Sequence, residues 1–211
     1  MNAFHAAVAE ANRSCSLIEQ GEYYEAIVQL TSSLSALKQI MPHASDDGSI
    51  KTSLDECIRS RTACSNIDEE VQGQFIYERV IYYNIPTDDE ISYRESVLVS
   101  CIVIFNLAIA YHLRGDRTSL TKSLKLYELS FNLQKDQQFE NNILFTLAIV
   151  NNLGLVHRKL NDEQSASKCF DHILSTLMYL TDCGQASEHH LDGFFHNVTG
   201  VVSQPTVAAA A

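Results

Sequence analysis

The sequence predicts an all-α protein, an irregular stack of antiparallel helical hairpins with an acidic, partly extended insertion. Three observations predict this class. Only three prolines and eight glycines occur in 211 residues, which favours long helices over a turn-rich β fold. Apolar residues recur at helical spacing over most of the chain. A short pattern occurs three times, beginning at Asn12, Asn106 and Asn152: an asparagine on one helix, a loop, and small residues on the next helix.

The first repeat-like part, residues 4–41, reads as two helices. Apolar residues from Phe4 to Ile18 recur at helical spacing. A glycine at Gly21 interrupts the pattern, and Tyr23 begins the second helix. That helix ends before Pro42, because a residue that precedes proline leaves the helical region easily.

Residues 43–96 form the acidic insertion. They contain twelve Asp and Glu against five Lys and Arg. Part of the insertion, residues 74–84, is instead rich in aromatic and β-branched residues, which favour extended chain. We expect these residues to lie as extended chain against the helices.

Two further repeat-like parts cover residues 97–134 and 140–181. In the first, a strongly apolar helix from Val97 to Leu113 is closed by Gly115. In the second, a long apolar helix is followed by a turn at Asn161-Asp162 and by its partner helix. Each part is therefore expected to be one helical hairpin.

The remaining residues complete a single predicted domain, residues 1–200. A short helix over residues 187–196 is expected to cover the open end of the stack. Residues 201–211 read as a flexible tail.

The last hairpin carries a recognisable set of packing positions: Leu153-Gly154, His157, Ala166, Phe170 and Ile173. This set resembles the tetratricopeptide repeat (TPR) family, whose repeats are paired antiparallel helices of about 34 residues stacked as an α-solenoid. Small residues there let neighbouring helices approach closely. The chain resembles about three degenerate repeats, but their asparagines are 94 and 46 residues apart. A different helical-hairpin array is the alternative.

The resemblance implies a concave groove that is lined by the first helix of each pair and receives an extended peptide. On this chain the partner-binding candidates lie on those first helices: Asn12, Asn106, Ile109, His112, Asn151, Asn152, Leu155 and Arg158. The lysine clamp that some members use is not expected, because Ala11, Phe105 and Asn151 stand where it needs lysines.

The three repeated asparagines have two interpretations. A primary amide has both a donor and an acceptor, so it can pair bidentately with a peptide backbone and ignore the peptide's side chains. Some members of the superfamily hold peptides with such a ladder. Alternatively, the amides bond neighbouring helix backbones and support packing.

Charge and composition restrict the partners. The formal net charge is −11 and no basic stripe occurs, so nucleic acid and anionic membrane are poor candidates. A basic or neutral protein or peptide is more compatible with the negative electrostatic potential of the chain. The sequence predicts no transmembrane segment and no secretion signal. We therefore expect a cytoplasmic or nuclear protein with reduced cysteines.

The sequence carries no phosphate loop, nucleophile elbow or zinc-protease motif. Glu95, Asp116 and Glu128 read as surface carboxylates. A cluster that could suggest zinc, namely Cys183, His189, His190 and His196, lacks the regular spacing of zinc ligands. We therefore expect a non-enzymatic scaffold or adaptor with no cofactor and no metal. The alternative is an obligate accessory subunit of a larger complex, and an enzyme is the least supported class.

Overall fold

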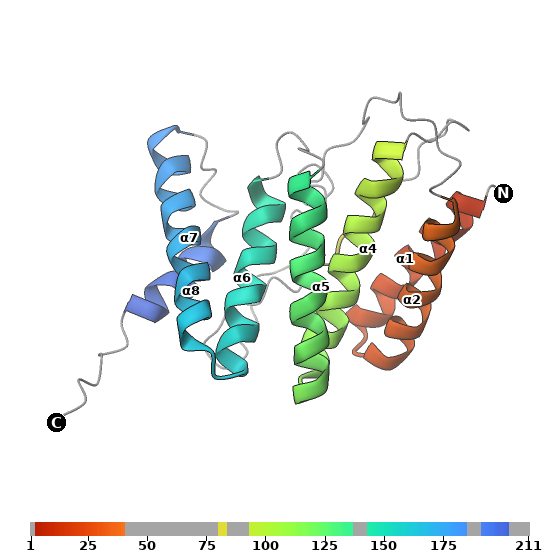
Figure 1. Ribbon diagram of the computed structural model, residues 1–211, viewed down its shortest axis with the longest axis horizontal. Helices are drawn as coiled ribbons and strands as arrows, with labels where there is room; N and C mark the ends of the chain where they lie inside the picture. Colours follow the sequence, from red (N-terminus) through yellow and green to blue (C-terminus); the bar gives the residue numbers. More distant parts are fainter. Residues whose placement is uncertain (1–2, 41–79, 84–92, 137–142, 185–190, 203–211) are drawn as a thin grey trace. The chain divides into compact units, whose positions relative to one another are not determined.

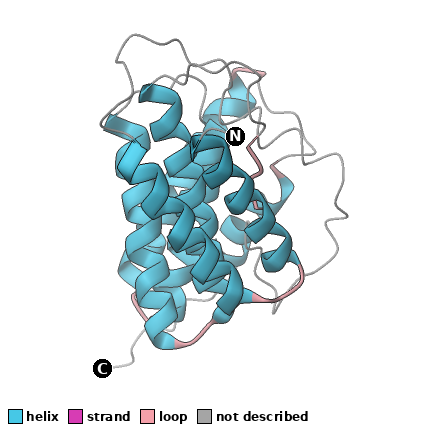
Figure 2. Ribbon diagram, turned by 90° about the vertical axis from the view of Figure 1, so that its right-hand side faces the viewer, coloured by secondary structure: helices cyan, strands magenta, loops and turns pink. Residues whose placement is uncertain are grey.

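The protein is all-α over the residues that the computed structural model describes, which are 3–40, 80–83, 93–136, 143–184 and 191–202. Figures 1 and 2 show helices and loops, and no strand, in these residues. The helices are α1 (Ala3–Glu19), α2 (Tyr23–Ile40), α4 (Tyr93–Arg114), α5 (Arg117–Asp136), α6 (Ile143–Lys159), α7 (Glu163–Asp182) and α8 (Asp192–Val202). The predicted fold class is confirmed at the level of all-α.

The chain divides into two compact units. The first comprises residues 1–65 and 78–149, and the second comprises residues 66–77 and 150–211. The prediction of a single domain over residues 1–200 stays a prediction. Most of residues 43–96 lies outside the described residues, as do residues 203–211 of the expected tail.

In the first unit, α1 packs on α2, α4 packs on α5, and α2 packs on α4. Corresponding serines join the two helices of each hairpin. The Ser33 hydroxyl donates to the Ala7 carbonyl at 2.6 Å, and the Ser130 hydroxyl donates to the Cys101 carbonyl at 3.3 Å. Ala7 and Cys101 each lie five residues before a repeated asparagine. The two hairpins are therefore held by equivalent contacts.

Each hairpin turn contains a residue in the left-handed region. Gly21 follows α1 with φ 81°, Gly115 follows α4 with φ 77°, and Asn161 follows α6 with φ 65°. Such residues end helices because the reversed backbone redirects the chain, and glycine and asparagine tolerate it best. The loops that the sequence predicts at these residues therefore coincide with the ends of α1, α4 and α6.

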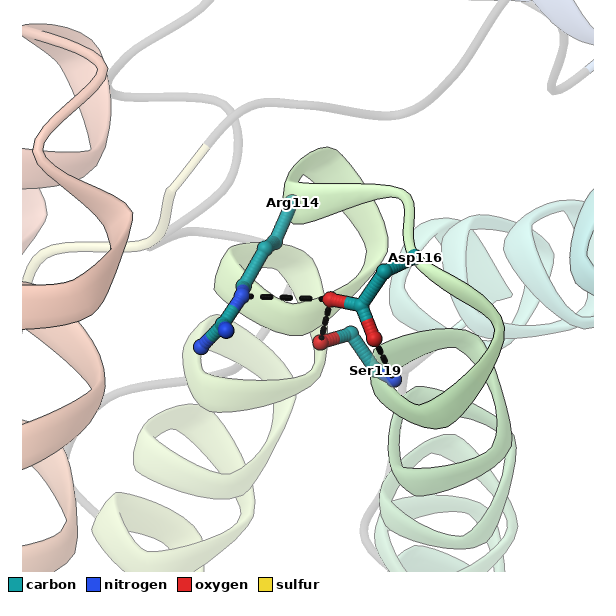
Figure 3. A network of polar contacts seen from close by, with 3 residues as sticks. All are labelled: Arg114, Asp116 and Ser119. Atoms are coloured by element: carbon teal, nitrogen blue, oxygen red, sulfur yellow. Dashed lines mark hydrogen bonds and ion pairs between the residues drawn. The ribbon is translucent and has the colours of Figure 1, made fainter.

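An aspartate then starts the second helix of two hairpins. Asp116 accepts from the backbone N–H of Ser119 at 3.0 Å and pairs with Arg114 Nε at 3.1 Å (Figure 3). Asp162 accepts from the backbone N–H of Ser165 at 3.1 Å. Each carboxylate satisfies a helix-start donor that otherwise has no partner in the helix.

Helix α4 is a long and strongly apolar helix of 22 residues. It begins at Tyr93, four residues before the predicted start at Val97. By length and composition it could cross a membrane, because an 18-residue window of it has a mean hydropathy of 2.0. However, 89% of that window is buried inside the protein. Burial on all sides is the property of a core helix, and it explains why polar residues at its start are also covered.

In the second unit, α7 packs against α8 and against Gly154 of α6, whose residues 150–159 belong to this unit. The Phe170 ring fills the space beside Gly154, where an added Cβ would meet the ring at 2.9 Å. Helix α8 runs obliquely across α7 (Figure 1). It spans Asp192–Val202, later in the chain than the predicted helix at 187–196. Phe194 and Val198, one helical turn apart, are both buried, so the apolar face extends past the predicted end.

Candidate functional site

A short segment of the protein's own chain, Val80–Tyr83, lies against α1 and α4 in the first unit. Its central contact is with Asn106 of α4. The Ile81 N–H donates to Asn106 Oδ1 at 2.9 Å, and Asn106 Nδ2 donates to the Ile81 carbonyl at 2.8 Å. One side-chain amide thus satisfies both backbone groups of one residue. Asn106 is 1% exposed, so water does not compete for these bonds.

Asn12 of α1 repeats this arrangement two residues further along the segment. The Tyr83 N–H donates to Asn12 Oδ1 at 3.1 Å, and Asn12 Nδ2 donates to the Tyr83 carbonyl at 2.9 Å. Asn12 is half-buried. The two asparagines therefore make four hydrogen bonds to the segment, all with main-chain atoms.

The spacing of these bonds shows the conformation of the segment. Residues 81 and 83 turn their N–H and C=O groups to the asparagines. In extended chain, a residue turns both groups to the same side, and alternate residues share that side. Each asparagine amide therefore takes the place that a backbone amide of a neighbouring strand would take. We expected extended chain against the helices here; of the predicted range, residues 74–79 and 84 lie outside the described residues.

The segment's side chains are also covered. Val80, Ile81 and Tyr83 are each 2% exposed. The Tyr83 hydroxyl donates to Glu95 Oε1 at 2.6 Å, and Glu95 is itself 2% exposed. The prediction that Glu95 is a surface carboxylate is therefore wrong. It lies in the first turn of α4, where the helix dipole favours a negative charge.

Tyr82 points to a more open environment. Its hydroxyl donates to Glu19 Oε2 at 3.1 Å and lies 3.1 Å from the Ser16 hydroxyl. Partial burial raises the pKa of Tyr82 above its ordinary value, so this hydroxyl keeps its proton at neutral pH.

Cys15 completes the contact between the helices and the segment. Its thiol lies 3.7 Å from the Ile81 carbonyl, and Asn106 Nδ2 lies 3.2 Å from its sulfur. Among the described residues, Cys15, Cys101, Cys169 and Cys183 are not joined in disulfides. Burial raises the pKa of Cys101 to about 12, so that thiol stays neutral.

Two other candidates of the first unit are core residues. Ile109 and His112 are both 0% exposed. The His112 ring meets the Tyr127 ring edge-on at 6.1 Å. His112 therefore takes part in aromatic packing between α4 and α5.

The candidates of the second unit form a separate cluster. Asn151, Asn152 and Leu155 are all 0% exposed. Asn197 of α8 donates to Asn151 at 2.7 Å, and Asn151 donates to Asn152 at 3.2 Å. Arg158 lies over the Phe170 ring at 4.8 Å. Asn152 thus belongs to an amide chain that connects α6 with α8.

Sequence reasoning missed several residues of the site: Cys15, Ser16, Glu19, Tyr83, Glu95. Only Tyr83 had a detectable signal, since it belongs to a stretch that was expected to lie on the helices. Glu95 gives no such signal, because Ser96 separates it from the apolar run that begins at Val97.

Among the described residues, no three His, Cys, Asp or Glu side chains form a group that could hold a metal ion. Cys183 is exposed and His189 and His190 lie outside the described residues. Comparisons with protein-family models, with curated proteins and with solved structures give no match.

Proposed function

We propose that this protein is a non-enzymatic adaptor that binds an extended peptide of a partner protein on a TPR-like stack of hairpins. Asn12 and Asn106 form the binding site, and Val80–Tyr83 fills it as an internal ligand. The observation that carries the proposal is the set of four hydrogen bonds from the two amides to main-chain atoms. Every residue except proline has these main-chain groups, so the contact depends little on this segment's sequence.

Equivalent contacts support the stacked-repeat interpretation. The hairpins α1–α2 and α4–α5 share a serine-to-carbonyl bond whose acceptor lies five residues before the repeated asparagine. All three hairpin turns use a left-handed residue. Repetition of such details is typical of repeat arrays.

The tether gives the internal segment an advantage over a partner. Nine residues separate Tyr83 from the start of α4. Docking of the segment is therefore intramolecular, which for a connection this short corresponds to an effective concentration on the order of 1 mM. A partner peptide with only the same contacts would compete at about that concentration. A physiological partner therefore needs additional contacts, and the net charge of −11 favours basic ones.

The experiment removes the internal ligand from the full chain by replacing Val80–Tyr83 with Gly-Ser-Gly-Ser. A fluorescent peptide copying residues 78–85 is then titrated and its anisotropy measured. We expect saturable binding, weakened at least about tenfold by Asn12→Ala or by Asn106→Ala, since each removes two hydrogen bonds. Asn132→Ala, at an exposed asparagine of α5, is the matched control.

A folded replacement variant that binds no peptide would overturn the proposal. Should the replacement lose its helical circular dichroism, the intact protein gives the answer by amide hydrogen exchange. Excess peptide should then speed exchange at Ile81 and Tyr83, whose N–H groups face the asparagines. Unchanged exchange at millimolar peptide would equally contradict the proposal.

One observation favours the second candidate function, an obligate accessory subunit. Tyr24 and Val28 lie one turn apart on α2 and are 70% and 48% exposed. Neighbouring exposed apolar side chains mark surfaces that other proteins cover. Size-exclusion chromatography separates the two: a stable soluble monomer supports the adaptor, and aggregation without a partner supports the subunit.

A further inference from the structure

The internal ligand places a tyrosine side chain against a buried glutamate. Tyr83, the residue bonded to Asn12, is 2% exposed, and its hydroxyl reaches the buried carboxylate of Glu95 at 2.6 Å. A carboxylate only accepts hydrogen bonds. The position therefore requires an aromatic side chain that ends in a donor.

We propose that the Asn12–Asn106 site selects peptides that carry an unphosphorylated tyrosine at the Asn12 position, two residues after an aliphatic residue at the Asn106 position. This inference rests on the proposed function. Phenylalanine at the tyrosine position removes one hydrogen bond from a carboxylate that water does not reach. A site with a buried polar group strongly rejects a ligand that cannot hydrogen-bond to that group. It discriminates much less between ligands that differ only by a methylene.

Phosphotyrosine is rejected for a different reason. Its phosphate replaces the donor hydroxyl and brings up to two negative charges beside Glu95. Like charges repel strongly in a buried environment of low dielectric constant. Phosphorylation of the partner's tyrosine would therefore prevent docking.

The two preceding positions of the peptide differ in selectivity: the Ile81 position is selective and the Tyr82 position is tolerant. Ile81, at the Asn106 position, is 2% exposed and requires an apolar residue. Tyr82, between the two bonded residues, is only half-buried, and its hydroxyl faces Glu19, whose side chain is exposed. Loss of the Tyr82 hydroxyl should therefore matter little.

The test compares four peptides that copy residues 78–85 against the full chain with Val80–Tyr83 replaced by Gly-Ser-Gly-Ser. The peptides are the parent, Tyr83→Phe, Tyr82→Phe and a form phosphorylated at Tyr83. We expect Tyr83→Phe to weaken binding about tenfold or more, and phosphorylation to weaken it at least as much. Tyr82→Phe is the matched control and should stay within about threefold.

A second arm examines Glu95 directly. In a Glu95→Leu variant the preference for the parent peptide over Tyr83→Phe should disappear, because the acceptor is gone. If the parent and Tyr83→Phe peptides bind equally well to the protein that retains Glu95, the proposed selectivity is wrong. The proposed function is not affected by that result. No binding of any peptide to the folded variant would instead overturn the proposed function.

Folding failure of the replacement variant does not remove the test. In the intact protein, Tyr83→Phe should reduce the exchange protection of the Ile81 amide about tenfold more than Tyr82→Phe does. Equal protection in the two variants would contradict the selectivity.

Discussion

At the scale of single residues, the site depends on the likeness between a primary amide and a peptide group. Asn106 offers its carbonyl to the Ile81 N–H and its amine to the Ile81 carbonyl. Bidentate pairing with a backbone was one of the two interpretations that the sequence left open for Asn12 and Asn106. The sequence could not identify the bonded chain, because the bonds join residues 71 and 25 positions apart and leave no local pattern.

The two asparagines should differ in their effect on stability. Asn106→Ala leaves two buried main-chain groups of Ile81 unsatisfied, which costs about 2 to 6 kcal/mol. Asn12→Ala should cost about 1 to 2 kcal/mol, because Asn12 is half-buried and water can replace it. Urea unfolding of both variants, with Asn132→Ala as control, measures the difference. Equal losses would mean that the Ile81 groups find other partners.

At the scale of elements, turn chemistry was the most predictable feature. Gly21, Gly115 and Asn161 were predicted to end helices, and all three have positive φ. Helix starts were less predictable. The apolar pattern of α4 begins at Val97, but the helix begins at Tyr93, since tertiary burial extends a helix into residues whose own pattern is polar.

The two capping aspartates predict an acid dependence. Hydrogen bonds from Ser119 lower the pKa of Asp116, and hydrogen bonds from Ser165 lower the pKa of Asp162, below the ordinary 3.8. A lowered pKa means that folding favours the charged form. Each charged aspartate therefore stabilises the fold fully above the ordinary pKa of the unfolded chain. This stabilisation is lost as the pH falls through the lowered pKa of the folded protein.

Asp116→Ala and Asp162→Ala should each lower the melting temperature at pH 7, and this loss should shrink at an acidic pH well below the ordinary pKa of 3.8. Thermal unfolding followed by helical circular dichroism at both pH values checks it. Asp171→Ala, at an exposed aspartate of α7, serves as control. If wild type and variants differ in melting temperature by the same amount at both pH values, the charge of the capping aspartate is unimportant.

At the scale of the whole molecule, the three repeated asparagines belong to two different environments. Asn12 and Asn106 of the first unit bind the segment, whereas Asn152 of the second unit is bonded to Asn151. The sequence pattern treats the three alike. It could not separate them, because Asn197, which completes the second cluster, comes from a helix that the repeat pattern does not contain.

The long separation between Asn12 and Tyr83 also has a consequence for the order of folding. A ribosome adds 5 to 20 residues per second, so the 71 residues between them take roughly 4 to 14 s to synthesise. A helical hairpin forms far faster than that. The α1–α2 hairpin therefore has seconds in which to form before the residues that Asn12 will bond are synthesised.

Refolding in solution should keep the same order, because closing the long loop is entropically costly and is deferred. We expect Asn12→Ala to speed unfolding and to leave the folding rate within about twofold. Stopped-flow urea jumps measure both rates. A folding rate that falls in proportion to the lost stability would instead place the docking of Tyr83 within the rate-limiting step.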